Sequence, residues 1–138
     1  MNSPTIIAFV GFIAWSLVLL VLMEVVRSKL VLAKEVAPNG FNPENSNLSP
    51  FMQRLTRAHA NCLEGIPLFG GLMLAAVVTS NAPITDPLAY VFLGARIVQS
   101  LIHLASLSSV AVTMRFSAFA VQMCIGVYWC YQLLSVMI

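Results

Sequence analysis

Apolar residues along this chain gather into long runs that are separated by short polar segments. The first run, residues 6–23, is long enough to cross the hydrocarbon core of a bilayer, which takes about 20 residues of α-helix. It is too long for the apolar region of a secretory signal, and no positive charge precedes it. We therefore expect this run to form a membrane-spanning helix.

Three further helices are predicted after the first. Ser49 and Pro50 suit the cap and the first position of a helix, which continues through the apolar residues up to about residue 80. The Pro-marked segment 81–87 predicts a tight turn, and the small residues of segment 106–111 predict a short link. The predicted helices cover about residues 4–32, 50–80, 85–107 and 110–137. The expected fold is an all-α integral membrane protein, a four-transmembrane-helix bundle that forms one domain over residues 1–138.

Composition supports this assignment. The chain has 138 residues, of which 59% are hydrophobic and 9% charged, and its mean hydropathy is +0.90. A soluble domain carries about a quarter charged residues. A chain this short has too little polar surface to cover so apolar a core, so lipid must cover it. The net charge of +2 does not indicate nucleic-acid binding, because the basic residues border membrane spans.

The basic residues also predict an orientation. The first connection is flanked by Arg27, Lys29, Lys34, Arg54 and Arg57, and Arg115 lies near the third connection. The second connection has only Asp86. Under the positive-inside rule, the first and third connections face the cytoplasm and both termini face the opposite side. The brevity of the chain favours a bacterial inner membrane as the location.

The three cysteines, Cys62, Cys124 and Cys130, fall inside predicted helices. No CxxC pair and no histidine at ligand spacing accompanies them, so we expect neither a disulfide nor a metal site. Small, buried, apolar side chains are the simpler interpretation.

Polar residues inside three of the predicted helices repeat at the spacing of one helical face. These sets are Arg57, Asn61 and Glu64; Arg96, Gln99 and His103; and Arg115, Phe119 and Gln122. Ionisable residues within a membrane span are costly, so each set is a candidate functional site. His59 lies roughly on the opposite face from Arg57, where packing or a hydrogen bond between subunits is the simpler role.

Two interpretations of these polar stripes stay open. In the first, the stripes satisfy one another between helices, for example through a pair between Glu64 and Arg96. In the second, they line a hydrophilic cavity that opens to the cytoplasmic side. The excess of arginine over glutamate favours the cavity, because an unpaired buried arginine is costly and arginine binds carboxylates through two parallel hydrogen bonds. A small ligand with more than one carboxylate and an amine would suit such a cavity.

Segment 57–69 resembles the RxxxNxxE helix of the membrane-associated proteins in eicosanoid and glutathione metabolism, the MAPEG family, which includes microsomal glutathione transferases. Arg96 with Gln99 and His103, and Arg115 with Phe119, are further points of resemblance, which extends over the whole chain. The resemblance implies a homotrimer that binds glutathione between neighbouring subunits near the cytoplasmic side.

The resemblance also implies roles for individual residues. The residues that would contact glutathione are Arg57, Asn61, Glu64, Gln99, His103, Gln122 and Lys34. Arg115 would be catalytic, because a cation beside the thiol favours the thiolate, which is the nucleophile. Arg96 and His59 would have structural roles. Arg27 is an alternative to Lys34 as the basic residue that the first helix contributes.

The implied function is a glutathione transferase that conjugates glutathione to lipophilic electrophiles from the bilayer, and glutathione peroxidase activity is compatible with the same site. The alternative is a non-enzymatic protein that binds or presents lipid, as one branch of the family does. Arg57, Asn61, Glu64 and Arg115 together favour the enzyme, because a lipid presenter needs no group that stabilises a thiolate. Several relatives carry tyrosine where this chain has Gln99 and His103, which argues against one of the specialised eicosanoid activities.

Overall fold

The computed structural model of the protein describes residues 3–138. Its elements are α1 (Pro4–Leu32), α2 (Pro50–Gly65), a π-helical turn (Ile66–Gly70), α3 (Gly71–Val78), α4 (Ala82–Ala105) and α5 (Ser109–Met137). The π-helical turn joins α2 directly to α3, so the described residues form four helices that are long and apolar enough to cross a membrane. The expected all-helical, four-span fold is confirmed.

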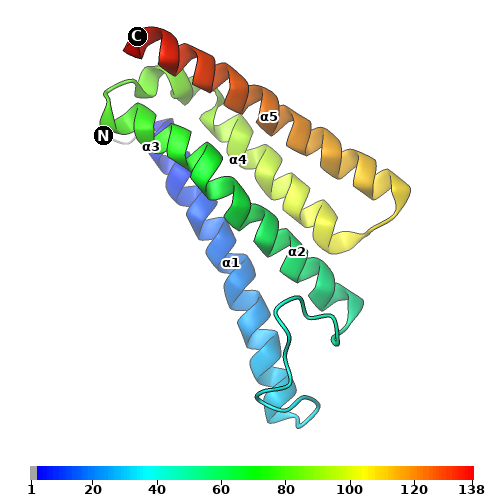
Figure 1. The fold of residues 1–138 in the computed structure, drawn as a ribbon. Helices are drawn as coiled ribbons and strands as arrows, with labels where there is room; N and C mark the ends of the chain where they lie inside the picture. The colour runs from blue at the N-terminus through cyan, green and yellow to red at the C-terminus, as the bar shows by residue number, and fades with distance from the viewer. Residues whose placement is uncertain (1–2) are drawn as a thin grey trace.

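The four spans run alternately in opposite directions (Figure 1). The start of α1, the end of α5 and the α3–α4 connection lie at one end of the bundle, and the other two connections lie at the opposite end, called here the loop end. Helix α4 packs against α1, α2 and α5, whereas α5 packs mainly against α4. Side chains on α4 can therefore contact all three other spans.

Serine caps begin three of the helices. The hydroxyl oxygens of Ser3, Ser49 and Ser108 each accept a hydrogen bond from the backbone N–H three residues later. Proline follows Ser3 and Ser49 at the first helical position, where its missing N–H would have had no helical partner. The local sequence thus sets where these helices begin.

The third span begins earlier than predicted, at Ala82 rather than near residue 85. Segment 81–87 is not a separate turn: Pro83 lies in the first turn of the helix, where proline is tolerated, and the helix continues through Pro87. Hydrogen bonds to α1 hold this first turn in place: the Thr5 backbone N–H donates to Asp86 Oδ1 at 3.0 Å, and the hydroxyls of Thr5 and Thr85 lie 2.6 Å apart. The starts of α1 and α4 are therefore tied together.

The second span changes its winding at the π-helical turn, which contains Pro67. Because proline has no N–H to donate to the preceding turn, the regular α-helical pattern is interrupted there. The turn places Phe69 against the ring of Phe92, with centroids 4.9 Å apart. Gly126 on α5 leaves room for Phe69, since a Cβ at that position would lie 2.8 Å from Phe69 Cε1. The half of the bundle away from the loop end thus has an aromatic core.

The long first connection is held by Asn45, which is buried and has a backbone φ of 55°. Asparagine tolerates this left-handed conformation better than most residues. Its Oδ1 accepts a hydrogen bond from Arg27 Nε at 3.1 Å, and its Nδ2 donates to the backbone oxygen of Met52 at 3.3 Å and to Thr56. Asn45 therefore fixes the end of α1 to the start of α2.

Candidate functional site

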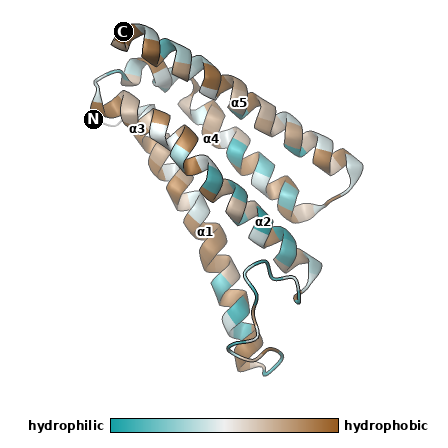
Figure 2. Cartoon of the chain, viewed as in Figure 1, coloured by the Kyte–Doolittle hydropathy of each residue, from teal (hydrophilic) through white to brown (hydrophobic). Residues whose placement is uncertain are grey.

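The polar stripe on α4 faces the interior of the bundle. Arg96, Gln99 and His103 have exposed fractions of 1%, 4% and 4%. Figure 2 shows hydrophilic positions on α2 and α4 between largely hydrophobic stretches. The structure thus places three of the predicted polar residues at the centre of the protomer, where α1, α2 and α5 meet α4.

The stripes of α4 and α5 contact each other through an amide pair. Gln122 Nε2 donates to Gln99 Oε1 at 2.8 Å and to the backbone oxygen of Ala118 at 3.1 Å. Gln122 Oε1 is buried and has no hydrogen-bond partner among residues 3–138. The structure therefore brings these two predicted residues together and leaves one acceptor unpaired.

His103 lies among arginines from the neighbouring helices at the loop end. Arg54 and Arg57 of α2 and Arg115 of α5 are all close enough to act electrostatically on its imidazole ring. Arg54 also donates from Nε to the backbone oxygen of Leu104 at 2.8 Å, which ties α2 to the end of α4. Arg54 was missed as a site residue, although its position three residues before Arg57 puts it on the same helical face.

The polar stripe of α2 lies on the outer side of the protomer. Arg57 and Glu64 are exposed and Asn61 is half-buried. The opposite face of α2 carries its buried residues, which are Met52, Leu55, Ala58, Cys62 and Gly65. Within a single protomer, Arg57, Asn61 and Glu64 are thus available to a ligand or a second subunit rather than used in the core.

Arg96 is enclosed without an acidic partner. Its Nη1 donates to the backbone oxygen of Asn61 at 3.4 Å, and its guanidinium lies 5.4 Å from the ring centroid of Phe12 and 5.9 Å from that of Phe119. Its Nε and Nη2 have no hydrogen-bond partner within residues 3–138. Glu64 is exposed and forms no ion pair with Arg96 among the described residues, so the Glu64–Arg96 pair considered from the sequence does not form in the protomer.

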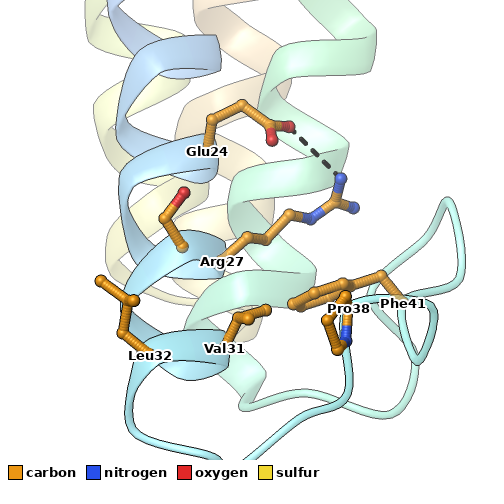
Figure 3. Close-up of a pocket in the computed structure, with 7 residues that line it drawn as sticks. Glu24, Arg27, Val31, Leu32, Pro38 and Phe41 are labelled. Atoms are coloured by element: carbon orange, nitrogen blue, oxygen red, sulfur yellow. Dashed lines mark hydrogen bonds and ion pairs between the residues drawn. The ribbon is translucent and has the colours of Figure 1, made fainter.

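The basic residues near the end of α1 are separate from this cluster. Under the first connection, a pocket of about 590 Å³ is lined by Glu24, Arg27, Ser28, Val31, Leu32, Pro38 and Phe41 (Figure 3). Arg27 is engaged there, since it pairs with Glu24 at 3.3 Å, lies 5.3 Å from the ring centroid of Phe41 and bonds to Asn45. Lys34 follows α1 with an exposed side chain, so it is the better placed of the two to meet a ligand.

The remaining predicted residues have simpler surroundings. His59 is half-buried on α2. Cys62 is buried with its Sγ 3.5 Å from Ser100 Oγ, as expected of a small core residue, whereas Cys124 and Cys130 are exposed on the protomer surface. The interpretation of all three cysteines as buried was therefore wrong for the two on α5, where lipid can cover an exposed apolar side chain.

Residues 5–135 match the model of the MAPEG family. Comparisons with curated proteins and with solved structures gave no significant match. The family includes glutathione transferases and related proteins of lipid metabolism, and it also has non-enzymatic members. The match covers all four spans and every polar stripe described above. With four membrane-spanning helices, polar stripes on three of them and a match over nearly its whole length, the chain belongs to the MAPEG family.

Proposed function

We propose that this protein is a membrane-bound glutathione transferase. The observation that carries the proposal is the group of arginines around His103, namely Arg54, Arg57 and Arg115, which includes no carboxylate. Glutathione offers two carboxylates, an ammonium group and a thiol. Hydrogen bonds between arginine and carboxylate are about twice as strong as neutral ones, so such a group suits this ligand.

The outward stripe of α2 would bind the polar part of the tripeptide. Arg57 would hold a carboxylate, Glu64 would accept from the ammonium group, and Asn61 would bond to a peptide group. On the inner wall, Gln99, His103 and Gln122 would complete the contacts, and Lys34 would add a cation from the end of α1. His59 would support the fold.

Arg115 would act on the thiol. A nearby cation lowers the pKa of a thiol and so raises the fraction present as thiolate. The thiol proton passes to water, and the sulfur then forms a bond to the electrophilic carbon. A leaving group departs with the bonding electrons, or, in a conjugate addition, the carbanion takes a proton from water.

The exposure of the α2 stripe supports an assembly in which a neighbouring subunit covers it. We propose a homotrimer, as the family resemblance implies, with the site between subunits. Its loop end would face the cytoplasm of a bacterial cell, where glutathione is available, and lipophilic electrophiles would arrive from the inner membrane.

Calorimetric titration of the protein in non-ionic detergent with glutathione tests the proposal. We expect saturable binding of both glutathione and S-methylglutathione, because the proposed polar contacts do not involve the thiol. Turnover of an aryl halide should require glutathione. The absence of saturable binding for both peptides would show that the proposed function is wrong.

A second candidate is a non-enzymatic protein that binds and presents lipid. It is favoured by an apolar groove of about 540 Å³ between the π-helical turn and α5. The groove is lined by Pro67, Leu68, Phe69, Gly71, Leu72, Met123, Gly126, Val127 and Cys130. Binding of a fluorescent fatty acid without any binding of glutathione would favour this second function.

A further inference from the structure

The guanidinium of Arg96 has one edge with no partner. Nε and Nη2 lie side by side on that edge, and both are buried without a hydrogen-bond acceptor in residues 3–138. The third nitrogen, Nη1, is the one that donates to the backbone oxygen of Asn61. An unpaired charge at this depth is costly to the protein, so a purely structural role does not explain why the edge is left open.

Apart from the thiol of Cys62, the surroundings of this edge are apolar. Rings of Phe12 and Phe119 lie on the guanidinium, and the neighbouring position on α2 is Gly65. A Cβ at Gly65 would lie 2.9 Å from Arg96 Nη2 and 3.2 Å from Phe12 Cζ. Glycine at this position is therefore what allows the guanidinium to lie between α1 and α2.

Arg96 and Arg115 differ in depth and in exposure to solvent. His103, which marks the level of the arginine group, is seven residues after Arg96 on α4, so Arg96 lies about 10 Å further into the bundle. Arg115 is half-buried, whereas Arg96 is 1% exposed. Solvent therefore screens Arg115 more than Arg96, and an anion beside Arg96 would feel a stronger attraction.

The connectivity of glutathione allows its sulfur to lie deeper than its carboxylates. The two carboxylates are at the ends of the peptide and the thiol is on the central cysteine, so a bent peptide can keep both carboxylates at the arginine group and direct the thiol into the bundle. The guanidinium of Arg96 lies 5.9 Å from the ring centroid of Phe119, which follows Arg115 by one helical turn, so a sulfur beside Phe119 would be near both arginines. The thiol is also the least polar functional group of the ligand, so it suits aromatic walls better than either carboxylate does.

We propose that Arg96 is a second catalytic residue, whose Nε and Nη2 donate hydrogen bonds to the glutathione sulfur when it is a thiolate. This inference rests on the proposed transferase function and adds a deeper cation to the one supplied by Arg115. The sulfur lies between the two arginines, beside Phe119. The thiol proton leaves to water at the loop end, the sulfur bonds to the electrophilic carbon, and the leaving group departs with its electrons.

The path of the electrophile agrees with this position. Met123 and Gly126 line the apolar groove on α5 and follow Phe119 at spacings of four and seven residues, on one face of the helix. A lipophilic molecule in the groove would therefore approach the sulfur from the side away from the loop end. The thiolate and the electrophile therefore meet on one face of α5, at the point where its polar residues end and its apolar residues begin.

The test is ultraviolet absorbance of the thiolate against pH, for glutathione bound to the wild type and to Arg96→Gln, Arg96→Lys and Arg115→Gln. We expect Arg96→Gln to raise the pKa of the bound thiol by at least one unit, which lowers both the thiolate fraction and turnover near neutral pH about tenfold. Arg96→Lys should restore part of both. Calorimetric affinity for S-methylglutathione, which cannot form a thiolate, should stay within about twofold.

Two further measurements separate this role from a structural one. Because Arg96→Gln removes an unpaired buried charge, the ligand-free variant should unfold at a temperature no lower than the wild type. Gly65→Ala keeps the arginine but displaces Nη2, so it too should raise the pKa of the bound thiol. An unchanged thiol pKa in Arg96→Gln, with glutathione still bound, would overturn the role of Arg96 while leaving the transferase function intact. If the wild type itself does not bind glutathione, the proposed transferase function is wrong, and the role of Arg96 is wrong with it.

Discussion

Gln122 on α5 donates a hydrogen bond from Nε2 to Oε1 of Gln99 on α4 at 2.8 Å, and both side chains are buried. In the described part of the chain this is the one hydrogen bond that joins two side chains of different polar stripes, because Arg96 donates to the backbone oxygen of Asn61 and not to its side chain. It fixes the rotation of α5 relative to α4, and with it the direction in which Phe119 faces.

Replacing one partner of this pair leaves the other unpaired, so the stability losses of the two single variants should not add. In Gln122→Leu the Gln99 amide remains buried without its donor, so we expect a loss of about 1–2 kcal/mol of stability, near the upper end for hydrogen bonds within membranes. The double variant Gln99→Leu/Gln122→Leu should lose less than the sum of the two single losses. Unfolding midpoints in detergent measure all three variants, and strict additivity would mean that the amides do not interact.

Arg57 should determine affinity for glutathione. Losing a bidentate contact to a carboxylate costs about 1.5–3 kcal/mol for each charge-assisted hydrogen bond, so Arg57→Ala should bind glutathione at least tenfold more weakly. Arg57→Lys should recover only part of the affinity, since lysine offers no planar fork. Calorimetry provides the comparison, with Lys29→Ala at the exposed end of α1 as a control that leaves affinity unchanged.

The positive-inside rule predicts which side of the membrane the loop end faces. In a cysteine-free background, a thiol at the exposed position of Glu44→Cys should react with an impermeant maleimide only from the cytoplasmic side. A thiol at Ile138→Cys, at the opposite end of the bundle, should react only from the other side. The reverse pattern would place the arginine group away from cytoplasmic glutathione.

Native mass spectrometry in detergent should report a trimer. The exposed polar stripe of α2 is costly in lipid unless another subunit covers it. A bulky substitution on that face, such as Ala60→Trp, should weaken the assembly, whereas Val136→Trp near the exposed end of α5 should not. A monomer that still binds glutathione would contradict a site between subunits.

The aromatic core predicts opposite effects for two glycines. Gly126→Ala brings a methyl group to 2.8 Å from Phe69 Cε1, and the resulting strain should destabilise the protein by about 1–3 kcal/mol. Gly94→Ala meets no atom within 4 Å and replaces glycine inside a helix, so it should stabilise the fold by up to about 1 kcal/mol. Unfolding midpoints of the two variants should therefore move in opposite directions.

Hydropathy and local signals predicted the spans well, because crossing a bilayer demands long apolar helices and the serine caps mark where they begin. The expectation of a turn over residues 81–87 was wrong, because a helix accommodates Pro83 in its first turn and α4 continues through Pro87. The π-helical turn at Pro67 was also missed, because nothing in the local sequence separates it from a simple kink.

Spacing identified the polar stripes but not the direction in which each one faces. In a membrane protein, residues that face lipid and residues that face the core are both apolar, so hydropathy does not reveal which side of α2 is buried. Arg57 and Glu64 lie on the outer face, so the pair between Glu64 and Arg96 that one of the two interpretations suggested does not form within the protomer. Gly65 leaves room for the Arg96 side chain of α4, and this requirement cannot be predicted from the sequence of α2 alone.

The π-helical turn also determines how the second span tolerates a change in its length. A turn of this kind accommodates one extra residue, and each residue of an α-helix advances the side chains by about 100°. Deleting one residue from a regular helix would rotate everything after it by that angle, whereas deleting one residue between Ile66 and Gly70 would restore a regular α-helix and leave the faces of α2 and α3 in their present directions. The apolar groove and the peptide-binding stripe would therefore keep their relative orientation when this span changes its length by one residue.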